Sequence, residues 1–211
     1  MPLVYQQNIN AVTKIGVWHI TETEDHFLQH VPLKREITHW HKRLQHLAGR
    51  LLLKELYPGF PVDLIRIAGT RKPFLENEPW HFSISHCGDH AAVIVSKEYR
   101  VGVDVELKTE KIGSIINKFL TTEELFLLPR GAINEMATLF WSVKESIYKW
   151  YGRGGVDFKK DITIKKISGE ADQGIVHSVF KNEIMVDVHF LCFNDNYLTW
   201  VLTEEKKPLR H

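Results

Sequence analysis

An order of secondary structure elements that occurs twice is the feature of this chain that most constrains its fold. Hydrophobic periodicity and turn residues predict a strand, a short helix, a long helix and three strands in the first half, at 14–20, 22–29, 33–57, 64–67, 81–85 and 91–96. They predict the same order, with one strand more, at 101–106, 122–128, 134–151, 161–167, 175–180, 184–193 and 198–203. We therefore expect an α+β fold of two similar α/β halves related by pseudo-twofold symmetry.

The boundary between the halves is expected near Tyr99 and Arg100. This gives an N-terminal α+β half over residues 1–99 and a C-terminal α+β half over 100–211, which would carry the metal-binding and catalytic residues. No low-complexity linker separates them, so the halves should pack closely. A cleft between two packed units is a preferred place for a ligand, and we expect the active site there.

The segment 141–150 is predicted to be a helix with two different faces. Its apolar stripe, continued from the preceding turn, is formed by Leu139, Phe140, Val143, Ile147 and Trp150. Trp141, Glu145 and Lys149 follow at intervals of four residues on the other face. A glutamate four residues before a lysine is also common on solvated helices. The helix alone therefore leaves a chemical face and a solvated face as open interpretations.

Two acidic residues lie two positions apart in the β-branched run Gly102–Glu106. On a strand, Asp104 and Glu106 project to the same side, where like charges repel unless a cation joins them. Hard carboxylate oxygens suit Mg²⁺, which completes its octahedron with water and substrate phosphate. Glu145 would add a third carboxylate, and Lys149 would help to bind a pyrophosphate. The alternative is an exposed strand face.

A third segment, 81–90, combines a predicted strand with a turn. Gly88 and Asp89 supply turn residues directly after His86. A histidine at the end of a strand, beside small hydroxyl residues, can donate to a phosphate oxygen. The chain has 12 histidines, and His39, His41 and His46, which show no ligand spacing, are expected to be surface residues.

Taken in order, Ser83–His86, Gly102–Glu106 and Trp141–Lys149 resemble the motifs of the surfactin-type, long and pseudo-dimeric, 4'-phosphopantetheinyl transferases. The resemblance extends to Lys72-Pro73 before the first motif and to Ala48-Gly49-Arg50 on the long N-terminal helix. Pro32, Lys34 and Arg35 match a basic pair after a proline near the start of that helix.

The resemblance implies an enzyme that transfers 4'-phosphopantetheine from coenzyme A to a serine of an acidic apo acyl or peptidyl carrier protein and releases 3',5'-adenosine bisphosphate. It implies Mg²⁺ on Asp104, Glu106 and Glu145, and catalytic roles for Glu145, Lys149 and His86. Glu145 has two open roles, metal ligand and general base. The residues implied for coenzyme A are Arg50, Lys72, Ser85, His86, Lys149, Lys34 and Arg35.

The chain departs from the family pattern near Ile37, where some relatives carry an extra basic residue. Recognition of the 3'-phosphate would then be weaker or depend on Arg35 and Arg43 instead. The carrier protein is expected to dock on the short helix of the second half, and its apolar candidates there are Phe119, Leu120, Phe126 and Leu127.

Composition agrees with a globular protein and argues against several other classes. The chain has 211 residues, enough for a proper core, and its two cysteines, Cys87 and Cys192, follow no metal or secretory spacing. No motif activates Cys87 as a nucleophile. A net charge of +1 argues against a nucleic-acid partner. No segment predicts a membrane span or a signal peptide, so we expect a cytoplasmic monomer with no membrane partner.

Two alternative functions remain open from the sequence. A metal-dependent nuclease is suggested by Glu106-Leu107-Lys108 with Asp89 upstream, but it leaves Glu145 and Lys149 unexplained. A non-catalytic module that binds carrier proteins or nucleotides would have a decayed site, whereas all three acids and their basic partners are present.

Overall fold

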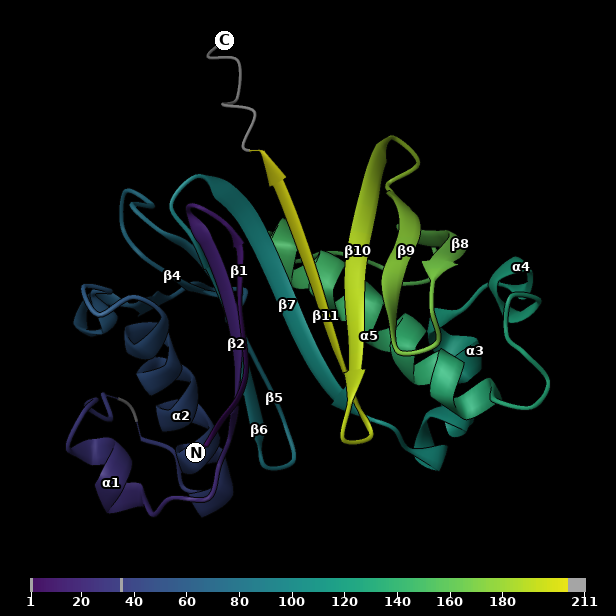
Figure 1. Ribbon diagram of the computed structural model, residues 1–211. Coiled ribbons are helices and arrows are strands. Elements are labelled where there is room, and N and C mark those ends of the chain that lie inside the picture. Colours follow the sequence, from purple (N-terminus) through teal and green to yellow (C-terminus); the bar gives the residue numbers. More distant parts are fainter. Residues whose placement is uncertain (1, 35, 205–211) are drawn as a thin grey trace, which may run out of the picture.

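The computed structural model describes residues 2–34 and 36–204, and it confirms an α+β fold with two large antiparallel sheets, each packed by helices, and a small two-stranded sheet (Figure 1). The first half contains β1 (Leu3–Asn10), β2 (Thr13–His19), α1 (Glu24–Leu28), α2 (Trp40–Leu56), η1 (Val62–Leu64), β3 (Arg66–Ile67), β4 (Pro73–Phe74), β5 (His81–Cys87) and β6 (His90–Ser96). The second contains β7 (Tyr99–Leu107), η2 (Glu110–Ser114), α3 (Ile116–Phe119), α4 (Thr122–Leu125), α5 (Ile133–Tyr151), β8 (Ile162–Gly169), β9 (Gln173–Phe180), β10 (Ile184–Phe193) and β11 (Asn196–Glu204). Here η1 and η2 are short 3₁₀ helices.

The two sheets share a connectivity. Their strand orders are β1-β2-β6-β5 and β7-β11-β10-β9-β8. In each half the strand directly before the helices, β2 or β7, pairs with the last strand of that half, β6 or β11. That last strand pairs in turn with the strand before it, β5 or β10. The repeated order of elements in the sequence thus corresponds to a repeated pattern of strand pairing.

Helix α2 packs its leucine-rich face on the first sheet. The core there includes Trp18 of β2, Phe82 of β5 and Val93 of β6. Gly49 allows a close approach, because a Cβ atom at this position would come within 2.8 Å of Ile84 Cγ2 on β5. The glycine of the Ala-Gly-Arg motif therefore sets the distance between α2 and the strand beneath it.

Helix α5 packs on the second sheet with the apolar stripe that the sequence predicts. Its buried side chains include Leu139, Phe140, Val143, Ile147 and Trp150. On β7, Gly102 leaves no room for a side chain, since a Cβ atom would collide with the backbone of Ser146 and Trp150. Gly152 ends the helix in the left-handed conformation, with φ at 69°. Because Gly102 has no side chain, β7 and α5 lie almost in backbone contact.

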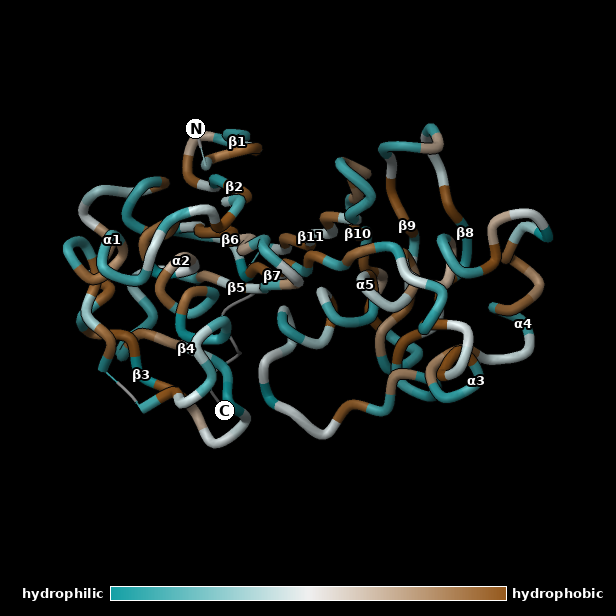
Figure 2. The backbone as a smooth tube through the Cα atoms, turned by 90° about the horizontal axis from the view of Figure 1, so that it is seen from below, coloured by the Kyte–Doolittle hydropathy of each residue, from teal (hydrophilic) through white to brown (hydrophobic). Residues whose placement is uncertain are grey.

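The halves meet where β5 and β7, the edge strands of the two sheets, lie side by side (Figure 2). Ser83 Oγ accepts a hydrogen bond from the Val103 amide at 3.2 Å, and Cys87 Sγ accepts one from the Leu107 amide at 3.4 Å. A separate apolar core lies between the sheets and contains Ile15, Val17, Ala92, Ile94, Val101, Val103, Val105, Leu198 and Trp200. The junction is therefore an apolar core bordered by side-chain hydrogen bonds.

The structure departs from the predicted elements in several places, and it contains β4, η2 and α3, which the sequence prediction omits. The long N-terminal helix begins at Trp40, not at 33, because β-branched Ile37 and Thr38 disfavour helix and Lys34 is bound to Asp63 across the loop. The sequence prediction also omits β1, whose centre is polar at Gln6 and Gln7; this outer strand pairs only with β2.

Candidate active site

Asp104 lies at the centre of the candidate site, on β7 beside α5. Its side chain is 2% exposed, so the alternative of an exposed strand face is wrong. Ser85 Oγ of β5 and Lys149 Nζ of α5 donate to Asp104 Oδ1 at 2.7 and 2.6 Å. Ser142 Oγ of α5 donates to Oδ2 at 2.8 Å. The carboxylate is thus held by groups from both halves of the chain.

Two further carboxylates, on Glu106 and Glu145, lie within the electrostatic influence of Asp104. Glu106 accepts a hydrogen bond from Trp141 Nε1 at 3.3 Å. Burial, followed by the charge of Asp104, raises the pKa of Glu106 to about 7. Burial also raises the pKa of Glu145; the ammonium group of Lys149 opposes this effect and the charge of Asp104 adds to it. The fold therefore brings all three predicted acids together around one lysine.

The donor set of this cluster fits a hard divalent cation. Its two raised pKa values show that burial and the neighbouring carboxylate make the ionised forms unfavourable, and a bound cation would relieve this. As they stand, no three Asp, Glu, His or Cys side chains in residues 2–34 and 36–204 are arranged to hold a metal ion. Lys149 Nζ forms an ion pair with Asp104 Oδ1 at 2.6 Å, so a bound cation and this ammonium group would compete for the same oxygen.

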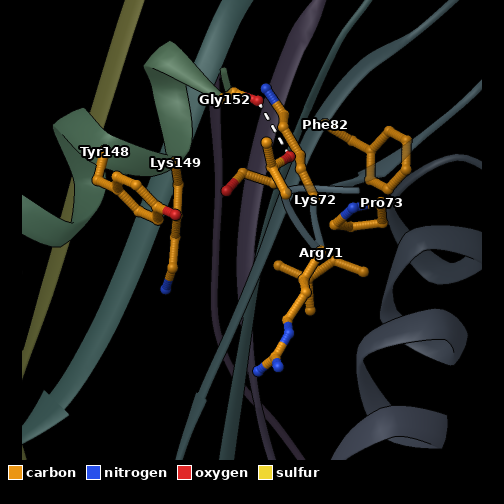
Figure 3. A pocket seen from close by; sticks show the side chains of 10 residues that line it. Arg71, Lys72, Pro73, Phe82, Tyr148, Lys149 and Gly152 are labelled. Carbon is orange, nitrogen blue, oxygen red and sulfur yellow. Dashed lines mark hydrogen bonds between the residues drawn. The ribbon is translucent and has the colours of Figure 1, made fainter. Parts of the chain in front are cut away.

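A cavity of about 270 Å³ adjoins the acidic cluster and is formed by both halves. Lys149 lines it and also contacts Asp104, so this side chain links the cavity to the cluster. Figure 3 shows Tyr148 and Lys149 on one side of this cavity, and Phe82, Pro73 and Arg71 on the opposite side. Its position matches the expectation of a ligand site between the halves.

Two basic residues enter this cavity from the loop between β3 and β4. The Lys72 ammonium group lies against the Gly152 backbone, and burial, followed by the positive charge of Arg100, lowers the pKa of Lys72 to about 8. Arg71 has a φ of 66°, an uncommon conformation for a residue with a side chain. Sequence reasoning identified Lys72 through its motif but missed Arg71 and Tyr148, which carry no motif.

Arg50 and Lys34, which are also predicted to bind coenzyme A, contact protein groups outside the cavity. Arg50 lies on α2 and donates to the His46 carbonyl at 3.2 Å. Lys34 donates to the Asp63 carbonyl at 2.6 Å, and Arg35 lies outside the described residues. Among the described residues, neither Arg50 nor Lys34 lines the cavity. Their assignment to coenzyme A stays a prediction.

Arg43, the alternative for the 3'-phosphate, forms an ion pair with Glu24 of α1. Ile37, where the sequence was expected to depart from the family pattern, is 9% exposed and belongs to the protein interior. Arg43 is therefore already engaged by a carboxylate, which an anionic ligand would have to displace.

His86 lies near the end of β5, on the opposite face from Ser85, because side chains alternate along a strand. Its side chain reaches solvent. Desolvation by the surrounding protein, then the charge of Lys149, lowers the pKa of the imidazole. His86 thus makes no contact with Asp104 of the kind that Ser85 makes, but the charges of Lys149 and Asp104 act on it, and its predicted bond to a phosphate stays a prediction.

A buried ion pair next to Glu145 escaped sequence reasoning. Lys144 and Glu124 both have 0% side-chain exposure, and Lys144 Nζ lies 2.8 Å from Glu124 Oε1. The ammonium group also donates to the carbonyl groups of Phe119, Phe158 and Ile162 at 2.8–2.9 Å. This pair joins α4, the segment after α5 and β8 to the helix that carries Glu145 and Lys149.

Half of the predicted docking residues are wrong. Phe119 and Leu120 are 2% and 0% exposed, because they pack in the core beneath α5. Phe126 and Leu127, directly after α4, are 85% and 38% exposed. Only the latter two residues are available to a partner.

The residues that suggested a metal-dependent nuclease contact other side chains in the structure. Asp89 is bonded to His41 of α2 at 2.8 Å, and Lys108 to Glu135 at 3.3 Å. Glu106 instead contacts Trp141, so the three nuclease candidates have different partners. Burial raises the pKa of the Cys87 thiol to about 11, which agrees with the expectation that it is no nucleophile.

The chain thus has two α+β halves, with a carboxylate–lysine cluster and a cavity lined in part by basic residues at their junction. Residues 100–202 match the family model of the 4'-phosphopantetheinyl transferase superfamily. The matched part contains Asp104, Glu106, Glu145 and Lys149, and the match confirms the resemblance expected from the sequence motifs.

Curated relatives agree with this assignment. An L-aminoadipate-semialdehyde dehydrogenase-phosphopantetheinyl transferase of Xenopus laevis is 32% identical over 51% of this chain and 43% of its own length. The 4'-phosphopantetheinyl transferase AcpT of Salmonella typhimurium is 28% identical over 53% of this chain and 60% of its own length. Enterobactin synthase component D of Salmonella typhi is 32% identical over 51% of this chain and 47% of its own length. The chain thus spans about half the length of the curated relatives it matches.

None of the helices in the described part of the chain combines the length and the apolar character needed to cross a bilayer.

Proposed function

We propose that this chain transfers the 4'-phosphopantetheine group of coenzyme A to a serine of an apo acyl or peptidyl carrier protein. The convergence of Asp104, Glu106 and Glu145 around Lys149, beside a cavity between the halves, supports this proposal most directly. These four residues lie in the segment that matches the superfamily. Phosphoryl transfer depends mainly on positioning and charge neutralisation, and such a cluster supplies both.

The three acids would hold Mg²⁺, which when bound neutralises charge on the pyrophosphate of coenzyme A. Lys149 already lies between the acids and the cavity, so its ammonium group can turn from Asp104 Oδ1 to a phosphate oxygen. Glu145 is the candidate to accept the proton of the attacking serine, because burial raises the pKa of its carboxyl group. From this one position the Glu145 carboxylate would serve either as a metal ligand or as the general base.

The cavity would receive the part of coenzyme A next to the pyrophosphate. Lys72 and Arg71 offer positive charge, while Phe82, Pro73 and Ile84 form an apolar wall. The lowered pKa of Lys72 fits this role, since an anionic ligand would offset the cost of burying the charged ammonium group. The phosphates and an apolar part of coenzyme A could thus bind side by side.

A direct test is to incubate the protein with Mg²⁺, coenzyme A and an apo carrier protein, and to weigh the carrier by mass spectrometry. We expect the carrier to gain the mass of one phosphopantetheine group, and omission of Mg²⁺ to prevent the gain. A carrier in which alanine replaces the acceptor serine should not change in mass. An unchanged wild-type carrier, across fatty-acid, polyketide and peptide types, would contradict the proposed activity.

The exposed Phe126 and Leu127 are the candidate contact for the carrier. Lys118 and Arg130 are exposed on either side of them in the sequence, which suits an acidic partner. Phe126→Ala should raise the Michaelis constant for the carrier by about tenfold, because loss of an aromatic interface anchor costs roughly 1–2 kcal/mol. The constant for coenzyme A should not change.

Met185→Ala, at a 67% exposed residue of β10, is the matched control for this docking surface. Steady-state kinetics with each substrate varied in turn will separate the two constants. Equal effects of Phe126→Ala and Met185→Ala would show that the carrier docks elsewhere.

A further inference from the structure

Behind Asp104 lies a set of buried hydroxyl groups that the reaction itself does not require. Ser142 and Ser146, one turn apart on α5, and Thr199 on β11 are all 0% exposed. Thr199 lies directly opposite Asp104 in the pairing of β11 with β7. The hydroxyl groups therefore occupy the space between the helix and the two strands, on the interior side of the carboxylate.

Each hydroxyl group has one proton, and the distances assign these protons consistently. Thr199 Oγ1 donates to the Ser142 carbonyl at 3.0 Å. Ser146 Oγ then donates to Thr199, whose Oγ1 and carbonyl oxygen lie at 2.6 and 3.0 Å. Ser142 Oγ, 2.9 Å from Thr199 Oγ1, is left to donate to Asp104 Oδ2 at 2.8 Å. All three protons thus have acceptors, which is what buried polar groups require.

This arrangement divides the two oxygens of Asp104 between the interior and the site. Oδ2 is held by Ser142 in the interior, whereas Oδ1 faces Ser85 and Lys149. Without the Ser142 hydroxyl, Oδ2 would be a buried acceptor without this donor, and the carboxylate could turn both oxygens toward Lys149. A two-oxygen contact with Lys149 would then compete more strongly with a cation.

We infer that Ser142 is a positioning residue, which fixes the Asp104 carboxylate so that Oδ1 alone faces the metal site. Groups that hydrogen bond to metal ligands orient them, and their loss commonly lowers metal affinity by about 10- to 100-fold. Ser146, like Ser142, lies within hydrogen-bond distance of the Thr199 hydroxyl group, but it does not contact Asp104. The two serines therefore differ in the one contact that matters here. This inference rests on the proposed function, because it presumes a cation at Asp104.

The test compares Ser142→Ala with Ser146→Ala in the full chain, with Mn²⁺ as the probe and electron paramagnetic resonance as the measure of free ion. In the presence of coenzyme A, Ser142→Ala should bind Mn²⁺ about 10- to 100-fold more weakly than the wild type. Ser146→Ala should bind near the wild-type affinity. Circular dichroism melting of both variants shows whether the fold is kept. If Ser142→Ala does not fold, Ser142→Cys, with a weaker donor of similar size, should weaken binding in the same direction.

Equal Mn²⁺ affinities in the two alanine variants would overturn the positioning role. Carrier modification by the wild type, measured in parallel, separates the two claims. A wild type that modifies the carrier, with Ser142→Ala binding Mn²⁺ normally, refutes the positioning role and leaves the function intact. A wild type that leaves the carrier unmodified, with weakened Mn²⁺ binding only in Ser142→Ala, refutes the function and supports the positioning role.

Discussion

Replacement of Glu145 by glutamine is expected to lower the rate of carrier modification by roughly 10²-fold or more. The amide keeps the shape of the side chain but loses the charge that would hold a cation and the basicity that would accept the serine proton. The fold should be retained, because burial and Asp104 raise the pKa of Glu145 and so make its charge unfavourable. A glutamate on a merely solvated helix face would contribute only about 0.2–0.5 kcal/mol through its lysine partner.

The matched control is Glu135→Gln, at the beginning of the same helix. Glu135 is 56% exposed and pairs with Lys108, so its replacement should leave the rate close to that of the wild type. Single-turnover measurements with saturating coenzyme A and carrier protein give the rate of the chemical step. Full activity in a folded Glu145→Gln variant would exclude this carboxylate from catalysis.

The second large effect concerns stability. Lys144→Met is expected to lower the free energy of unfolding by about 3–5 kcal/mol, because it leaves the Glu124 carboxylate buried without its cation. The carbonyl groups of Phe119, Phe158 and Ile162 would lose the same donor. Urea unfolding followed by circular dichroism measures this loss, and Lys160→Met, at an 82% exposed lysine paired with Asp157, is the comparison, with an expected loss below about 1 kcal/mol.

The double variant Lys144→Met with Glu124→Gln completes a mutant cycle for this pair. It should be less destabilised than the sum of the two single variants, since the glutamine carries no charge to be left unpaired. Additive losses, or a loss of less than about 1 kcal/mol in Lys144→Met, would show that water reaches the pair and screens it.

Sequence periodicity was sufficient for the residues that share one element. Alternation along β7 predicted the common side of Asp104 and Glu106, and helical spacing predicted the row of Glu145 and Lys149. Lys144 could not be found this way, because its partner Glu124 lies 20 residues away and only the packed fold brings them together. Ser142 escaped for the same reason.

Short elements without a repeating pattern gave the weakest predictions. Phe119 is the last residue of α3 and Phe126 directly follows α4, and nothing in the sequence distinguishes the buried ring from the exposed one. The division of the chain at residues 99 and 100 also stays a prediction, although β7 begins at Tyr99 and the first sheet ends with β6 at Ser96. Propensity placed the long helices but not the start of α2.

The side-by-side placement of β5 and β7 has a consequence for aggregation. Edge strands carry unpaired backbone groups that readily recruit strands of other molecules. Here the two edges cover each other, and two amides of β7 are bound by Ser83 Oγ and Cys87 Sγ. Separation of the halves would uncover both edges at once. Contact between the halves thus protects the protein from self-association as well as forming the cavity between them.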